Sequence, residues 1–187
     1  SSFLLLALAL GAGFLWYERS RPPAKLVALV AALAALAAIG RIAFAPIPNV
    51  KPTTDIVLIA GFALGAAPGF TVGAVAALAS NVIFGQGPWT PWQMAAWGLC
   101  GLFGALLGRM SGRSMGRLPL ALACGAAGLG FSLLMDFSTW ATYTGAHTVG
   151  EYLAIVSLSL PFTIAHVVGN IAFCAAFGPA FLRALLR

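Results

Sequence analysis

The chain has 187 residues, of which 61% are hydrophobic and 7% are charged, and its mean hydropathy is +0.99. Because a water-soluble domain carries about 25% charged residues, this composition excludes a soluble globular protein and predicts a surface that mostly faces lipid. The formal net charge of +6 does not indicate nucleic-acid binding, since the basic residues lie in gaps between apolar runs, as in the cytoplasmic loops of membrane proteins.

Seven apolar segments follow one another, and each is predicted to be a membrane helix. They cover about 3–17, 25–44, 54–67, 70–84, 91–108, 118–137 and 153–182. The third and fourth are short and meet at Pro68-Gly69, which predicts either two short spans or a broken hairpin. Interrupted membrane helices often border substrate sites, because irregular backbone must be buried in protein or line a cavity.

Positive charge is concentrated after the first segment, after the fifth segment and at the end of the chain. The residues are Arg19, Arg21, Lys25, Arg109, Arg113, Arg117, Arg183 and Arg187. The positive-inside rule places these regions in the cytoplasm, so the predicted loops 45–53, 85–90 and 138–152 face outward. Nearly all unusual residues lie in or beside those outer loops, which predicts a specialised outer face.

Alanine recurs at helical spacing in the second segment. Small residues four apart let helices approach closely, either within the chain or against a partner membrane protein. The alanines are Ala28, Ala31, Ala32, Ala35 and Ala38.

Several polar residues fall within or beside apolar segments, where such side chains tend to face a cavity or a partner. They are Arg41, Asn81, Asp136, His166 and Asn170. An ion pair of Arg41 with Asp55 or Asp136 is one interpretation. His166 and Asn170 share a helix face, and hydrogen bonds between helices are the alternative to ligand binding there.

The stretch from Phe84 to Gln93 is the most specific local pattern. It reads Phe-Gly-Gln-Gly-Pro-Trp-Thr-Pro-Trp-Gln and carries two amides, Gln86 and Gln93, with two indoles, Trp89 and Trp92. Aromatic platforms with a few placed amides suit a flat ligand with a polar rim. An aromatic belt at the membrane interface is the alternative.

The sequence contains no recognisable catalytic pattern. It has no HExxH, no GxSxG, no paired carboxylates and no phosphate-binding glycine loop. Cys100, Cys124 and Cys174 lie within apolar runs and form no CxxC pair. We therefore expect no enzymatic activity, no nucleotide hydrolysis, no cofactor and no metal site.

Taken together, these patterns resemble the substrate-binding S component of energy-coupling factor (ECF) vitamin transporters. The resemblance rests on the alanine-rich segment, Arg41, Pro48-Asn49-Val50-Lys51-Pro52, the short glycine-rich segments and Phe84–Gln93. It covers about residues 25–182 and is most specific over 41–108. It implies an all-α membrane protein, in which 24–187 form a six-helix bundle and 1–23 add one further transmembrane helix with a basic loop.

The resemblance also implies a function. The chain would be a multi-pass subunit in the cell membrane of a prokaryote, with loop 109–117 and the C-terminus cytoplasmic. It would bind a vitamin at its outer face and deliver it through a transmembrane scaffold subunit powered by two ATPase subunits. The alanine face would dock on the scaffold.

Residues of the outer loops and helix ends are the expected solute ligands. They are Arg41, Asn49, Lys51, Asn81, Phe84, Gln86, Trp89, Trp92, Gln93, Asp136, Trp140, Tyr143, His166 and Asn170. The loop rich in Gln and Trp most resembles members assigned to cobalamin, and riboflavin or a pyrimidine or queuosine-like base are the alternatives. From another class, a stand-alone secondary transporter or channel is the alternative function.

Overall fold

The computed structural model describes residues 2–19 and 21–187; positions 1 and 20, both in the predicted N-terminal region 1–23, lie outside the described residues. The helices are α1 (Ser2–Arg19), α2 (Ala24–Ala43), α3 (Thr53–Leu64), α4 (Ala66–Phe84), α5 (Trp89–Met110), α6 (Arg117–Tyr143) and α7 (Val149–Leu185). No strand occurs in the described ranges, so the all-α prediction is confirmed.

Among the described residues, four helices are long and apolar enough to cross a membrane. They are α2, α4, α6 and α7, with mean hydropathies of 2.3, 1.6, 1.9 and 1.7. A hydrocarbon core about 30 Å thick needs about 20 helical residues. Helix α7 has 37 residues and is therefore about 55 Å long, so it extends beyond such a core. These helices indicate a membrane-associated protein.

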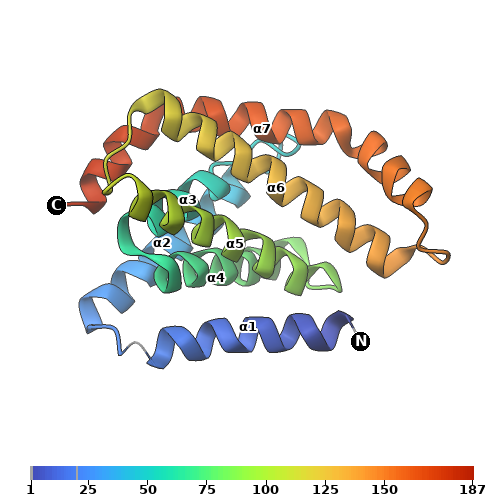
Figure 1. The fold of residues 1–187 in the computed structure, drawn as a ribbon, viewed down its shortest axis with the longest axis horizontal. Coiled ribbons are helices and arrows are strands. Elements are labelled where there is room, and N and C mark those ends of the chain that lie inside the picture. The colour runs from blue at the N-terminus through green and yellow to red at the C-terminus, as the bar shows by residue number, and fades with distance from the viewer. Residues whose placement is uncertain (1, 20) are drawn as a thin grey trace.

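The helices run roughly along one direction, and most of their connections gather at two ends (Figure 1). The α1–α2 and α5–α6 connections and the C-terminus lie at one end, which we call the basic end. The N-terminus and the α4–α5 and α6–α7 turns lie at the opposite end. The basic regions that were predicted to share one side of a membrane therefore share one end of the bundle. Of the predicted outer loops, 85–90 and 138–152 lie at the opposite end, whereas 45–53 lies between the two ends.

Helices α3 and α4 are separated by a single residue. The break was predicted at Pro68-Gly69, but α3 ends at Leu64 and Gly65 makes the turn with φ 101°. Glycine alone adopts this conformation without strain. Pro68 instead lies in the first turn of α4, where its missing N–H has no helical partner to lose.

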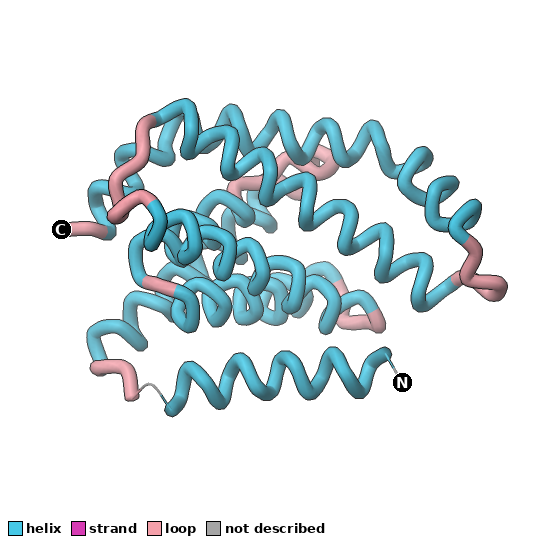
Figure 2. The backbone as a smooth tube through the Cα atoms, in the orientation of Figure 1, coloured by secondary structure: helices cyan, strands magenta, loops and turns pink. Residues whose placement is uncertain are grey.

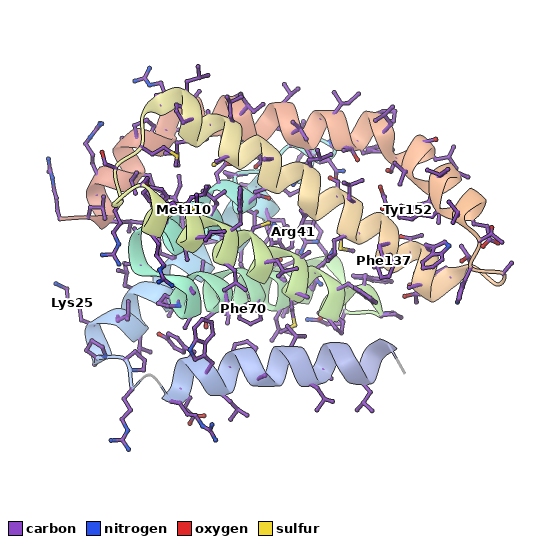
Figure 3. All side chains as sticks on the ribbon, viewed as in Figure 1. Lys25, Arg41, Phe70, Met110, Phe137 and Tyr152 are labelled. Atoms are coloured by element: carbon purple, nitrogen blue, oxygen red, sulfur yellow. The ribbon has the colours of Figure 1, made fainter. Side chains whose placement is uncertain are left out.

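The tightest packing joins α3, α4 and α5. A Cβ atom on Gly69 would lie 2.5 Å from the Cα of Gly61 and 2.9 Å from the carbonyl oxygen of Gly101. The three backbones therefore meet directly, as small residues allow in membrane helices. Helix α1 packs on the outside of this group, on the side where Phe70 lies (Figure 3). Phe14 of α1 meets Phe70 edge-on, with ring centroids 6.4 Å apart.

Helices α6 and α7 form a long hairpin on the other side of the group. The loop predicted over 138–152 is shorter than expected, because α6 continues to Tyr143 and α7 begins at Val149. A capping box of Thr148 and Glu151 fixes the start of α7. In Figure 2 the α2–α3 loop lies among the helices, set back from the α6–α7 turn.

Candidate functional site

A cavity of about 220 Å³ lies between the end of α2, the 44–52 loop, α5 and the α6–α7 hairpin. Arg41, Asn49, Lys51, Gln93 and Asp136, all predicted as solute ligands, line it together. The remaining wall consists of Trp97, Phe131, Ser132, Met135, Ser159, Phe162 and Thr163. The fold therefore brings residues from the second, fifth and sixth predicted segments and the first outer loop into one site.

Arg41 is the central polar group of this site. Its side chain points into the bundle (Figure 3), and the residue is 8% exposed. Nη1 donates to Ser80 Oγ at 2.6 Å and to Asn81 Oδ1 at 2.7 Å, while Nη2 reaches Gln93 Oε1 at 3.5 Å. Two of the predicted ligands, Asn81 and Gln93, thus hold Arg41 in place.

Aromatic rings cover the faces of the Arg41 guanidinium. Its Cζ lies 4.7 Å from the centroid of Phe84 and 4.9 Å from that of Trp97. Cation–π contacts of this kind are strongest where water is excluded. Phe84 therefore contributes to the site through Arg41, without lining the cavity itself.

The predicted ion pairs of Arg41 are wrong. Among the described residues, no carboxylate oxygen lies within 4.0 Å of a charged nitrogen of Arg41. Asp136 instead accepts a hydrogen bond from Ser159 Oγ at 2.7 Å, and both carboxylate oxygens of Asp55 are buried without a partner. Arg41 turns toward α4 because Ser80 and Asn81 offer oxygens there, so its charge has no counter-ion.

Lys51 adds a second cation to the same cavity. It lies in the loop between α2 and α3, outside the spanning helices. Burial lowers the pKa of its ammonium to about 8, and the positive charge of Arg41 acts in the same direction. A hydrogen-bonding anion in the cavity would relieve both effects.

A chain of hydrogen bonds fixes the loop that carries Lys51. Trp97 Nε1 donates to Thr54 Oγ1 at 3.2 Å, Thr54 Oγ1 lies 3.2 Å from His166 Nε2, and His166 Nδ1 lies 2.8 Å from the Asn49 carbonyl oxygen. Since a carbonyl only accepts, Nδ1 carries the proton, and Nε2 accepts from the Thr54 hydroxyl. His166 therefore joins helices and holds the loop, outside the cavity wall.

Asn170 also lies behind the site. It is fully buried, and its Nδ2 donates to the His166 carbonyl oxygen in its own helix at 2.8 Å. The interpretation as a hydrogen bond between helices therefore fits His166, whereas Asn170 bonds within its own helix and its Oδ1 has no partner.

The other predicted ligands lie at the end of the bundle opposite the basic end and do not line the cavity. We call Gln86, Trp89, Trp140 and Tyr143 the aromatic rim. Gln86 bonds to the Leu78 carbonyl oxygen and to Thr90, which closes the α4–α5 turn. Trp140 donates to the Thr148 carbonyl oxygen. Trp89 and Tyr143 are 39% and 60% exposed, as in an interfacial belt.

Trp92 faces neither the cavity nor the rim. Its ring packs against Phe137 at 5.8 Å in a T-shaped arrangement. The Phe84–Gln93 stretch therefore separates into residues that hold the site, residues that shape the turn and one that packs the helices.

The sequence did not identify seven of the twelve residues that line the cavity. Ser159 and Thr163 lie four residues apart on α7, followed by His166 and Asn170 at helical spacing. This polar stripe in an otherwise apolar helix was a usable signal. Trp97, Phe131 and Phe162 gave no signal, because aromatic residues are common throughout such helices.

The small-residue face of α2 is mostly unpacked. Ala28, Ala31, Ala32 and Ala35 are exposed, whereas Ala38 is buried within the bundle. In the described part of the chain, no group of three or more His, Cys, Asp or Glu side chains could hold a metal ion.

Comparison with known proteins gives one relationship. No curated protein and no solved structure matches the chain. A family model described as "Family of unknown function (DUF6580)" matches residues 21–184, which cover α2 to α6 and all but the last residue of α7, leaving α1 outside. The chain therefore belongs to the DUF6580 family.

Proposed function

We propose that the chain is the substrate-specificity subunit of an ECF-type importer in the cell membrane of a prokaryote. The observation that carries this proposal is the cavity that gathers Arg41, Lys51, Gln93 and Asp136 inside a small helical bundle. Concave sites in which placed polar groups converge beside apolar and aromatic side chains are typical of small-molecule binding. Charged groups within a membrane bundle mark such sites because they are costly to bury.

The position of the cavity supports uptake from outside. Arg41 lies in the last turn of α2, away from the basic end, and the 44–52 loop and the end of α6 complete the wall. With the basic end in the cytoplasm, the solute enters from the outer face. Helices α2 to α7 then form the six-helix core, and α1 is an accessory helix outside the family match.

The exposed alanine face of α2 supports docking on a scaffold subunit. Ala28, Ala32 and Ala35 present a flat surface along a spanning helix, which a partner helix can approach closely. The scaffold and its two ATPase subunits would supply the energy for transport.

Co-expression with an ECF scaffold and its ATPase pair tests this proposal. We expect a complex of all four subunits to be captured through a tag on this chain. Ala32→Leu should abolish capture, because the added side chain prevents close approach, whereas Ala176→Leu on the exposed face of α7 should not. Failure of the unaltered chain to form the complex would refute the proposal.

One observation favours a second candidate, a stand-alone secondary transporter. The buried Asp55 carboxylate has no hydrogen-bond partner, and unpaired acids within membrane bundles often bind protons. Proton-driven solute uptake by the purified chain alone in liposomes, abolished by Asp55→Asn, would establish that function instead.

A further inference from the structure

We infer that the cavity binds a compact amphipathic solute that bears a carboxylate group; the inference rests on the proposed function and defines its substrate class. It follows from the charge balance, the remaining donors and the size of the cavity.

The charge balance favours an anion. Arg41 and Lys51 both line the cavity, and neither has a carboxylate oxygen within 4.0 Å among the described residues. Asp136 is the one acid in the wall and already accepts from Ser159. Two cations facing one acid leave an excess positive charge in the cavity. A buried charge is costly unless it is paired, and a solute anion would supply the missing partner.

The remaining donors of Arg41 favour a carboxylate over other anions. The two N–H groups of Nη1 donate to Ser80 and Asn81, and these hydrogen bonds fix the orientation of the guanidinium. Nε has no partner, and Nη2 has only the 3.5 Å contact with Gln93. The Nε–Nη2 edge is therefore the fork of the guanidinium that lacks a strong partner. Nε is closed off in this structure, so a carboxylate would accept two parallel hydrogen bonds from this fork after a small shift of the Arg41 side chain toward the cavity.

The other residues of the cavity wall indicate the chemistry of the rest of the solute. Trp97 and Phe131 stack at 4.4 Å and, with Phe162, form an apolar surface for a ring or a short hydrocarbon chain. Asp136 lies on α6, across the cavity from the end of α2, and would accept from an N–H or O–H group on the far end of the solute. The expected ligand therefore has a carboxylate at one end and a hydrogen-bond donor at the other.

The size of the cavity argues against a corrinoid. Small-molecule pockets usually measure about 300–1,000 Å³, and this cavity has about 220 Å³. A corrinoid macrocycle with its amide side chains is too large to be enclosed there. The cobalamin prediction rested on the loop with Gln86, Trp89, Trp92 and Gln93, and of these four residues Gln93 alone lines the cavity.

Matched pairs of acids and neutral analogues test the inference. The purified chain in lipid nanodiscs would be titrated with biotin and its methyl ester, pantothenate and panthenol, nicotinate and nicotinamide, and lipoate and lipoamide. Riboflavin and cyanocobalamin complete the panel. We expect at least one acid to bind and its neutral partner to bind at least about tenfold more weakly, because loss of the charge leaves both cations unpaired.

Variants of Lys51 and Arg41 test whether the preference for the acid arises in the cavity. Lys51→Gln should weaken binding of that acid about tenfold, while Lys25→Gln, at the start of α2 near the basic end, should leave it unchanged. Arg41→Lys keeps the charge but removes the fork, so it should weaken the acid more than the neutral analogue. Thermal unfolding of each variant, measured alongside, would show whether it folds.

The outcomes separate the two proposals. Equal binding of an acid and its neutral analogue, or binding of riboflavin or cyanocobalamin alone, would overturn the carboxylate inference while leaving the proposed function intact. Absence of binding by the whole panel would also overturn it. Only failure of the complex with scaffold and ATPases would refute the proposed function.

Discussion

The cavity and the aromatic rim lie in the same part of the molecule, and both were predicted to bind solute. In the cavity, the buried Arg41 and the half-buried Lys51 have no counter-ion among the described residues, and Gln93 faces the same space. In the rim, Gln86 and Trp140 have their hydrogen bonds satisfied by nearby backbone groups. Polar groups indicate a binding site when the fold leaves them without a hydrogen-bond or charge partner. A concentration of polar residues in one loop is weaker evidence for a site.

Loss of the Arg41 anchor should have the largest effect. Asn81→Leu removes the 2.7 Å acceptor of Nη1 and leaves a buried cation with fewer partners. Because hydrogen bonds to charged groups contribute about 1.5–3 kcal/mol, we expect a marked fall in the thermal unfolding midpoint and loss of solute binding. Gln86→Ala in the rim should change the midpoint much less. Equal losses in both variants would remove the distinction between the two regions.

The second largest effect should be a difference in affinity for the acid between a variant of the cavity and a variant of the aromatic rim. Gln93→Ala removes a cavity amide that contacts both Arg41 and Asn81, and we expect the dissociation constant of the acid to rise about tenfold. Trp89→Ala removes an exposed indole and should leave it within about twofold. Calorimetric titration of both variants provides the measurement. The opposite order would make the rim the site.

The pH dependence of binding should follow Lys51. Its pKa of about 8 in the folded protein lies below the usual value of 10.5, so the ammonium is charged at pH 7 and mostly neutral at pH 9. We expect affinity for the acid to fall by up to about tenfold across that range. Arg41 and Asp136 also face the cavity, and His166 lies behind it. Lys51→Gln should therefore flatten the profile, and an unchanged profile would assign it to another group.

The smallest effect should come from the His166 hydrogen bond. His166→Asn removes the 2.8 Å contact to the Asn49 carbonyl oxygen, so the 44–52 loop should open more often. We expect amide hydrogen exchange in this loop to rise a few-fold, as for loss of about 1 kcal/mol. His147→Asn, near the rim, should leave this loop unaffected. Equal exchange in wild type and His166→Asn would show that the loop is held by other contacts.

The sequence predicted the helical fold and the common end of the basic connections well, because apolar length and loop charge are local properties. It misplaced the α3–α4 break, since Pro68 reads as a helix end unless the tolerance of a first turn for proline is considered. It also identified Arg41 and Asp136 as buried polar residues. It could not tell that they face one cavity without touching, because that depends on the angle between α2 and the α6–α7 hairpin.

The aromatic residues were the hardest to assign from sequence. Trp89, Trp92 and Trp97 lie within nine residues on one stretch of α5, yet one is exposed, one packs against Phe137 and one lines the cavity. Helical periodicity predicts that these side chains point in different directions from α5. Which of those directions faces a cavity depends on how the surrounding helices pack.

The central claim is that solute binds in the cavity, and tryptophan fluorescence tests it most directly. Trp97 lines the cavity, and Trp140 belongs to the rim. One variant would retain only Trp97, with Trp16, Trp89, Trp92 and Trp140 replaced by Phe, and a second would retain only Trp140. We expect the bound acid to change the emission of the Trp97 variant saturably and to leave that of the Trp140 variant unchanged. A saturable change confined to the Trp140 variant would place the solute at the rim and contradict this account.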